Sequence, residues 1–290
     1  MSHVAIAGER GLVSRALQQR LKALPGVDVT VVPTEDAMTP EGSAHLAKAD
    51  LVVLAVQDFA SPRIVELLPA ETRVLDVSPA FRGDPRWVYG LPELPGQDEL
   101  IATAHRVANP GCFATSAILV LAPLIQAGVL ASNAAVYLDA VGGYSTGGSA
   151  MESKALAGDL PAEAVYSLAK EHRHIPEIQR FSGVTGPLWL VPKIAKFARG
   201  IRMQVPLLGV SREAALNGWN AAYANTKVQV DEQIPAKLPA DEWAHRTGAC
   251  LRAIPQPGGC LAVCSLDNLG KGAVDSAFDN VLLMLGIVSS

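Results

Sequence analysis

The sequence has little charge and few aromatic residues: 18% of its 290 residues are charged, 5% are aromatic, and the formal net charge is −4. A nucleic-acid-binding surface needs clustered Lys and Arg, so nucleic acid is not expected as a partner. Uninterrupted apolar runs stay well below the roughly 18 residues that a membrane helix needs. The first residues also lack the basic segment, apolar stretch and cleavage site of a signal peptide. We therefore expect a cytoplasmic protein that does not enter membranes.

Cysteine is also scarce, and its spacing excludes the usual cysteine sites. The four cysteines form no C-x-x-C pair, and three of them cluster far from the first. This is not the spacing of a zinc site, and a cytoplasmic chain has little reason to form disulfides, so we expect no metal. A small buried cysteine behaves as a hydrophobic residue, which is our interpretation of three of them: Cys250, Cys260 and Cys264.

The first part of the chain alternates between predicted strands and predicted helices. Apolar strand-like runs recur along it: residues 3–7, 27–32, 51–56 and 74–77. Strands that alternate with helices indicate a parallel sheet covered on both faces. Residues 1–111 are therefore predicted to form a Rossmann-type nucleotide-binding domain of the α/β class, to which residues 270–290 return as a closing helix.

The chain changes character after the turn Asn109-Pro110-Gly111. A long apolar helix is predicted from Cys112 to about Ala127, and alternating patterns typical of strands follow it: residues 134–141, 188–192, 200–207, 227–230 and 260–267. These patterns favour a largely antiparallel sheet. Residues 112–269 are therefore predicted to form an α+β domain for substrate binding and oligomerisation.

A glycine-containing turn, Gly8-Glu9-Arg10-Gly11-Leu12, lies between the first predicted strand and the first helix. Backbone N–H groups at a helix N-terminus suit a pyrophosphate, and glycines let the backbone approach it. The pattern G-x-x-G-x-x-S departs from G-x-G-x-x-G, and a plain tight turn explains it almost as well. Glu35 and Asp36 follow the second strand without a Lys or Arg to bind a 2′-phosphate, so NAD stays open beside NADP.

Cys112 falls at the start of the predicted apolar helix, directly after a Pro-Gly turn. Helix N-terminal amides stabilise a thiolate and lower its pKa, which favours a nucleophilic sulfur near neutral pH. The alternative is a buried cysteine that only packs there. Two histidines in the charged segment 171–178, His172 and His174, could be solvated, could bind a metal for which no third ligand is visible, or could serve a cysteine as general acid/base.

Seven segments, in consistent order along nearly the whole chain, resemble the N-acetyl-γ-glutamyl-phosphate reductase family of semialdehyde dehydrogenases in its shorter form. They are Gly8-Glu9-x-Gly11, 74–78 with Arg82, 88–94, 107–112, 143–148, 172–177 and 266–272. The resemblance implies an oxidoreductase of arginine biosynthesis that reduces N-acetyl-γ-glutamyl phosphate to the semialdehyde, releases phosphate and uses NADP, with NAD possible. Cys112 would form a thioester, and His174 would be the general acid/base.

The resemblance also implies the residues that bind substrate and cofactor. Substrate contacts are implied for Asn109, Ser145, Gly147, His172, Arg173 and Arg82. Cofactor contacts are implied for Gly8, Glu9, Arg10, Gly11, Leu12, Ser78, Gly143, Asn268, Gly270, Lys271 and Asn280. A homodimer or homotetramer, joined through the second domain, is implied as well.

The sequence departs from the family pattern at several positions. Gly142 stands where a serine is expected, Phe113-Ala114 replaces Tyr-Pro after the cysteine, and Ser14 replaces a glycine of the phosphate loop. Two alternatives therefore stay open: the same mechanism on an aspartyl or aminoadipyl phosphate, and a non-catalytic nucleotide-binding relative.

Overall fold

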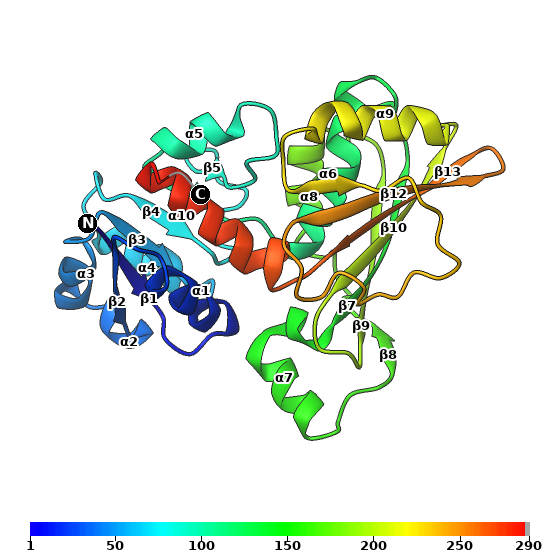
Figure 1. Ribbon diagram of the computed structural model, residues 1–290. Helices are drawn as coiled ribbons and strands as arrows, with labels where there is room; N and C mark the ends of the chain where they lie inside the picture. The colour runs from blue at the N-terminus through cyan, green and yellow to red at the C-terminus, as the bar shows by residue number, and fades with distance from the viewer. Residues whose placement is uncertain (288–290) are drawn as a thin grey trace. The chain divides into compact units, whose positions relative to one another are not determined.

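The computed structural model describes residues 1–287, which form two compact units (Figure 1). Unit 1 comprises Met1–Pro110 and the C-terminal segment from Ala273, and unit 2 comprises Gly111–Gly272. Each unit is built on one sheet and is described by itself below.

Unit 1 contains a parallel six-stranded sheet in the order β2-β1-β3-β4-β6-β5. Its strands are β1 (Ser2–Ala7), β2 (Val27–Val32), β3 (Leu51–Leu54), β4 (Val74–Asp76), β5 (Val88–Tyr89) and β6 (Arg106–Ala108). Its helices are α1 (Leu12–Lys22), α2 (Thr34–Ala37), α3 (Pro40–Leu46), α4 (Ala60–Leu67), α5 (Gln97–Thr103) and α10 (Asp275–Leu285). The predicted Rossmann-type sheet is confirmed, whereas β5 and β6 were missed because strands of two or three residues show no periodicity.

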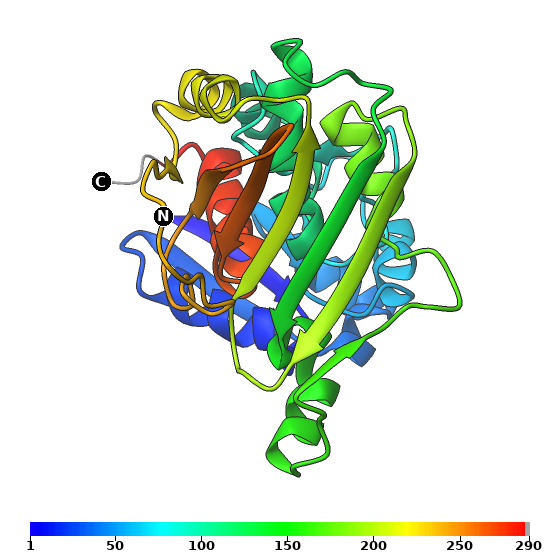
Figure 2. The same ribbon diagram turned by 90° about the vertical axis from the view of Figure 1, so that its right-hand side faces the viewer.

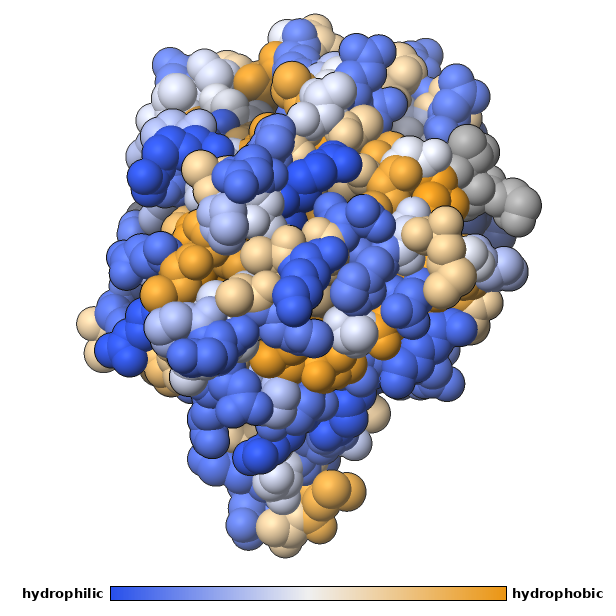
Figure 3. All heavy atoms as spheres, turned by 90° about the vertical axis from the view of Figure 1, so that its left-hand side faces the viewer, coloured by the Kyte–Doolittle hydropathy of each residue, from blue (hydrophilic) through white to orange (hydrophobic). Residues whose placement is uncertain are grey.

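The two faces of this sheet bury separate cores, because successive side chains of a strand point to opposite faces. On β1, Val4 and Ile6 join the core packed under α1 and α10, and Ala5 and Ala7 join the core under α3 and α4. Seen from the side of unit 1, hydrophilic atoms dominate the surface and hydrophobic atoms form small separate patches (Figure 3). Helices therefore cover both faces of the sheet. In open α/β sheets of this kind, ligands bind outside the carboxyl ends of the strands.

Unit 2 contains a seven-stranded sheet in the order β11-β12-β13-β10-β7-β9-β8. Its strands are β7 (Val136–Gly143), β8 (Glu163–Val165), β9 (Leu188–Ala195), β10 (Ile201–Leu208), β11 (Val228–Val230), β12 (Ala249–Gln256) and β13 (Gly259–Leu266). Its helices are α6 (Cys112–Gln126), the 3-10 turn η1 (Tyr144–Gly147), α7 (Gly148–Leu156), α8 (Ile175–Ser182) and α9 (Arg212–Tyr223). A π-helical turn, η2 (Gly270–Val274), leads into α10.

The sheet of unit 2 is largely antiparallel, as predicted: four of its six strand pairings are antiparallel, and the other two are parallel. β7 pairs in parallel with β9, and β11 pairs in parallel with β12. Both pairs are joined by long connections, which parallel neighbours require and which strand patterns do not reveal. β12 was missed because its first five residues are all buried, so it lacks the alternation of a half-exposed strand.

One face of the unit 2 sheet is covered by helices, and the other is open (Figure 2). α6 is apolar all round, and every residue from Phe113 to Leu124 is buried. Trp219 and Tyr223 on α9 donate side-chain hydrogen bonds of 2.9 and 2.8 Å to backbone carbonyls of α6. The catalytic cysteine predicted from sequence therefore starts a helix that is fixed on several sides.

Candidate active site

The N-termini of α6 and α8 meet in unit 2. The backbone N–H of Gly111, the residue before α6, donates a 2.8 Å hydrogen bond to Oε1 of Glu177 in the first turn of α8. This contact joins the turn that carries Cys112 to the helix that follows His174. Two helix N-termini at one place create a positive potential, which suits a thiolate and an anionic substrate.

Cys112 is the first residue of α6 and is half-buried. No side chain caps this helix, so the dipole at its start acts on the sulfur. Gly272 packs directly against the cysteine: a Cβ added to Gly272 would lie 2.8 Å from Cβ of Cys112. Glycine at position 272 therefore leaves the room that the cysteine side chain occupies.

The two histidines of the HRH segment are buried beside each other, 7% and 4% exposed, with ring centroids 4.7 Å apart. Phe113 presents its ring edgewise to both of them. Nδ1 of His172 accepts a 3.2 Å hydrogen bond from the backbone N–H of His174. Burial, together with the charge of exposed Arg173, lowers the pKa of His172 to about 4, so this ring is neutral near pH 7.

Tyr166 belongs to the same cluster and was missed by sequence reasoning. Its hydroxyl lies 3.4 Å from Nε2 of His172. Burial and the negative charge of Cys112 raise the pKa of Tyr166 well above its ordinary value. The phenol thus keeps its proton within electrostatic reach of the cysteine, so it is able to donate a hydrogen bond there.

A second buried network of unit 2 contains two predicted site residues. Asn268 donates from Nδ2 to Oγ of Ser145 at 2.8 Å and accepts at Oδ1 from the N–H of Gly200 at 2.9 Å. The Ser145 hydroxyl donates to the carbonyl of Ala198 at 2.6 Å. Gly143 packs so tightly on this loop that an added Cβ would lie 2.7 Å from the Ala198 carbonyl group. These residues fix the shape of the loop.

Arg199 lies on the same loop and was also missed. Its guanidinium forms an ion pair of 2.6 Å with the fully buried carboxylate of Asp267, and it remains partly exposed. The N–H of Gly270 and that of Gly272 both donate to the carbonyl of Asp267, at 3.0 and 2.9 Å. The ion pair therefore anchors the glycine turn that packs on Cys112.

In unit 1, the first loop and the start of α1 fit a dinucleotide pyrophosphate. Gly8 has a φ of +96°, and an added Cβ would lie 2.5 Å from the carbonyl oxygen of Ala55, so only glycine fits. α1 begins after Gly11 without a side-chain cap or an acidic residue in its first turn. Ser14, the departure from the family pattern, is buried and donates from Oγ to the Gly8 carbonyl at 2.5 Å. Serine thus stabilises the loop.

The loop also brings an ion pair to the end of β2. Oε2 of Glu9 accepts from the N–H of Thr34, the residue that starts α2, at 3.3 Å. Oε1 of Glu9 forms an ion pair of 2.7 Å with Arg10, whose side chain is 85% exposed. Because a dinucleotide places its adenosine ribose beyond the second strand, the pair of Glu9 and Arg10 would lie near this ribose, and Arg10 is its basic member.

The carboxyl edge of the sheet in unit 1 holds a buried amide network. Asn280 on α10 donates from Nδ2 to the Gly90 carbonyl at 2.9 Å and to Oδ1 of Asn109 at 3.0 Å. Asn109 in turn donates from Nδ2 to the carbonyl of Ala273 at 3.2 Å, and Arg82 donates from Nε to the Asn109 carbonyl at 2.9 Å. Oδ1 of Asn280 is buried without a hydrogen-bond partner. A nicotinamide carboxamide would satisfy this oxygen.

Two departures from the family pattern lie against each other in unit 2. A Cβ added to Gly142 would lie 2.7 Å from Cγ2 of Thr146 and 3.4 Å from Cζ of Phe113. Thr146 and the buried Phe113 ring therefore occupy the space that a side chain at position 142 would need. The other predicted residues lie as follows: Gly147 ends η1, Ser78 and Lys271 are buried, and Leu12 starts α1.

Comparison with known proteins covers both units. The family model for the semialdehyde dehydrogenase NAD binding domain matches residues 3–103, and that for the semialdehyde dehydrogenase dimerisation domain matches residues 112–268. N-acetyl-gamma-glutamyl-phosphate reductase 2 of Pseudomonas putida is 33% identical, with 99% of this chain and 98% of the relative covered. N-acetyl-gamma-glutamyl-phosphate reductase of Burkholderia ambifaria is 35% identical, with 99% and 97% covered.

Solved structures share the fold at lower identity. Aspartate semialdehyde dehydrogenase from Francisella tularensis matches with a TM-score of 0.77 and 14% identity, covering 99% of this chain and 100% of that one. The enzyme from Candida albicans, solved with NADP, matches with a TM-score of 0.75 and 12% identity, covering 99% and 100%.

Proposed function

The chain belongs to the N-acetyl-γ-glutamyl-phosphate reductase family of semialdehyde dehydrogenases, and from this premise we propose that it reduces N-acetyl-γ-glutamyl phosphate to the semialdehyde in arginine biosynthesis. The observation that carries the proposal is the hydrogen bond between Gly111 and Glu177. It brings the helix start with Cys112 to the helix start with His174, so a nucleophile and a proton carrier are held together. This arrangement is the requirement of covalent acyl transfer.

Cys112 forms the bond to the acyl carbon. As its thiolate attacks the carbonyl carbon, the bond from that carbon to the phosphate oxygen breaks, phosphate leaves and an acyl thioester remains on Sγ. The N-terminus of α6 stabilises the negative charge on sulfur and on the carbonyl oxygen. His174 holds the proton that this oxygen takes up, and Tyr166 donates a hydrogen bond beside it.

The cofactor is a nicotinamide dinucleotide, which supplies the hydride when it is bound. Within unit 1, Gly8 and the start of α1 would receive the pyrophosphate, and Asn280 would receive the carboxamide through its unsatisfied Oδ1. Arg10 favours NADP, since its exposed guanidinium pairs with Glu9, whose carboxylate accepts from the N–H of Thr34 at the start of α2.

Purified protein assayed in the oxidative direction tests the proposal. With N-acetylglutamate semialdehyde, phosphate and NADP⁺, we expect turnover by the wild type and none by Cys112→Ala. Cys260→Ala, which removes a buried thiol at the far end of the second sheet, is the matched control and should keep wild-type turnover. The proposal fails if Cys112→Ala stays active or if the wild type prefers aspartate semialdehyde in the same panel.

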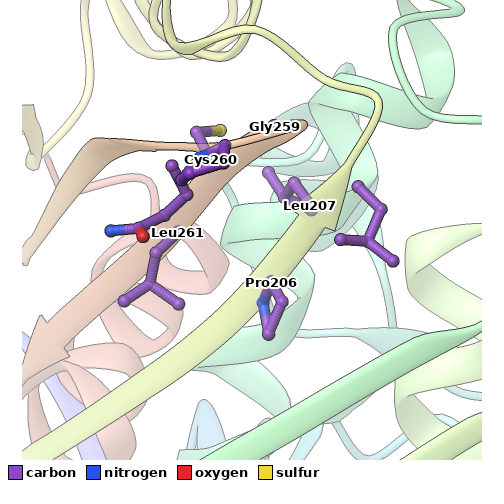
Figure 4. A pocket seen from close by; sticks show the side chains of 8 residues that line it. Pro206, Leu207, Gly259, Cys260 and Leu261 are labelled. Carbon is purple, nitrogen blue, oxygen red and sulfur yellow. The ribbon is translucent and has the colours of Figure 1, made fainter.

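The open face of the unit 2 sheet supports a homodimer. Two sets of apolar residues lie in register on this face: Trp189 and Tyr137 on β9 and β7, and Pro206, Leu261 and Ile254 on β10, β13 and β12. Trp189 is 69% exposed, and Leu208 at the end of β10 is 81% exposed. A cavity of about 280 Å³, lined by Pro206 and Leu207 of β10 and Gly259–Leu261 of β13, lies at the same end of the sheet (Figure 4). A second copy that packs here would bury these residues.

No helix within residues 1–287 is long and apolar enough to cross a membrane. The thiols of Cys250, Cys260 and Cys264 are free. A reducing compartment keeps thiols in this state, which supports a cytoplasmic location.

A further inference from the structure

Asp76 ends β4 and is fully buried, although the reaction described above does not use it. Its carboxylate receives three hydrogen bonds. Oδ1 accepts from the Ser61 hydroxyl at 2.8 Å and from the N–H of Ser78 at 3.1 Å, and Oδ2 accepts from the Ser78 hydroxyl at 2.8 Å. Three donors arranged around one buried carboxylate show that the fold provides a specific binding place for this side chain.

These bonds fix both ends of the loop from Val77 to Arg82. The Ser78 hydroxyl, held by Asp76, accepts from the N–H of Ala80 at 3.1 Å. At the far end, Arg82 donates to the carbonyls of Val77 at 3.4 Å and Asn109 at 2.9 Å. Asn109, which accepts from Arg82, is itself held next to Asp76, because its N–H donates to the backbone carbonyl of Asp76 at 2.8 Å. The loop conformation therefore depends on the Asp76 side chain at one end.

We propose that Asp76 is a positioning residue, whose carboxylate holds residues 77–82 so that Ser78 contacts the dinucleotide. The inference rests on the proposed function and adds to it a residue that touches neither the dinucleotide nor the substrate. According to this proposal, the affinity for the dinucleotide depends on the charge of Asp76, although Asp76 does not contact the dinucleotide.

The surroundings of Asp76 determine when it is charged. Leu54 of β3 and Ala108 of β6 stand opposite it in register and do not titrate, α4 contributes Ser61, and Arg82 is the charged group that acts on it. Burial raises the pKa of Asp76 to about 6, against the opposing effect of its three hydrogen bonds and Arg82. Protonation below this pH places a hydrogen among donors that already point at the carboxyl group, which loosens the loop.

Stability and binding respond to this group in opposite directions. Since the folded-state pKa is raised, the group favours folding at pH values below its ordinary pKa of 3.8, and this contribution is lost as the pH rises through about 6. A neutral side chain at position 76 should therefore leave stability at pH 7.5 unchanged or higher. Near neutral pH the charged Asp76 lowers the stability of the fold, and a residue that is kept at such a cost in stability fits a functional role.

The test is fluorescence titration of the full-length protein with NADPH between pH 5 and pH 8. For the wild type we expect the Kd to rise below pH 6. For Asp76→Asn we expect a Kd about 10-fold higher than that of the wild type at pH 7.5, a ratio of the two Kd values that falls toward one at pH 5, and a melting temperature equal to or above that of the wild type. Ser61→Ala removes one donor, so the midpoint of the wild-type pH dependence should move up.

Asp58→Asn, an exposed position at the start of α4, is the control and should match the wild type throughout. The inference is overturned if Asp76→Asn binds NADPH as the wild type does, with the same pH dependence. It is also overturned if Asp76→Asn loses affinity only together with its melting temperature, because the role would then be structural. If the wild type itself binds no NADPH, the proposed function fails and the inference fails with it.

Discussion

Nδ1 of His172 accepts a hydrogen bond from the backbone N–H of His174. The neutral ring of His172 therefore carries its proton on Nε2, the atom that faces the Tyr166 hydroxyl. His172 orients the phenol, and the phenol can direct its own proton toward the reacting atoms. Under the proposed function the two histidines of one tripeptide have different tasks: His172 would position a donor, and His174 would exchange the proton.

Removing the Tyr166 hydroxyl should slow the chemical step. Tyr166→Phe keeps the ring and loses the donor beside Cys112, so we expect kcat to fall by about 10- to 100-fold. NADPH affinity should stay unchanged, because Tyr166 is not among the residues implied to contact the dinucleotide. Steady-state kinetics and NADPH titration measure both, with Tyr137→Phe on the open sheet face as control. A kcat within twofold of the wild type would exclude the role.

Acid should destabilise the protein through His172. Its folded-state pKa of about 4 lies below the ordinary value of 6.5, so its contribution to stability is present above pH 6.5 and is lost as the pH falls toward 4. At pH 5 the loss amounts to about 2 kcal/mol of unfolding free energy. Urea denaturation at pH 7.5 and pH 5 should show a smaller difference for His172→Asn than for the wild type. His45→Asn, which changes an exposed side chain on α3, should show the wild-type difference.

Charge on the open face of the unit 2 sheet should dissociate the dimer. Trp189→Asp and Leu208→Asp place a carboxylate among or beside the apolar residues of this face, which a second copy would have to bury. Sedimentation equilibrium should give a dimer or larger assembly for the wild type and a monomer for each variant. Phe59→Asp, which changes an exposed aromatic residue of unit 1, should leave the assembly intact. A monomeric wild type would refute the interface.

Arg10 should set the preference for NADP. Arg10→Ala removes the guanidinium paired with Glu9, so we expect the KM for NADPH to rise about 10-fold while the KM for NADH changes little. Arg63→Ala, an exposed position on α4, is the control. Equal changes for both cofactors would show that Arg10 does not bind the 2′-phosphate.

Restoring the expected serine at position 142 should be costly in this protein. Gly142→Ser brings a Cβ within 2.7 Å of Cγ2 of Thr146, and overpacking of this kind costs about 1–3 kcal/mol. Thr146→Ser removes that methyl group and keeps the hydroxyl that donates to Gly143 at 2.7 Å. The double variant should recover most of the loss in chemical denaturation. Additive effects of the two substitutions would contradict the steric coupling.

Local patterns predicted the elements whose own residues dictate them. The continuous apolar run after Gly111 predicted a helix from Cys112 to about Ala127, and α6 ends at Gln126. The strand before Gly8 was also predicted, because buried parallel strands are continuous apolar runs. β6, with three residues, and β12, buried where alternation was expected, carried no such signal.

Within the site, the sequence by itself determined the residue types that do chemistry: a cysteine at a helix start, a histidine pair and a glycine turn before α1. Their partners were decided only by tertiary structure. Glu177 reaches Gly111 across 66 residues of chain, and Asn280 reaches Asn109 across 171. Helix starts and glycine turns follow from the conformations of neighbouring residues, whereas the charge state and the orientation of His172, Tyr166 and Asp76 depend on burial and on donors that only the folded chain brings together.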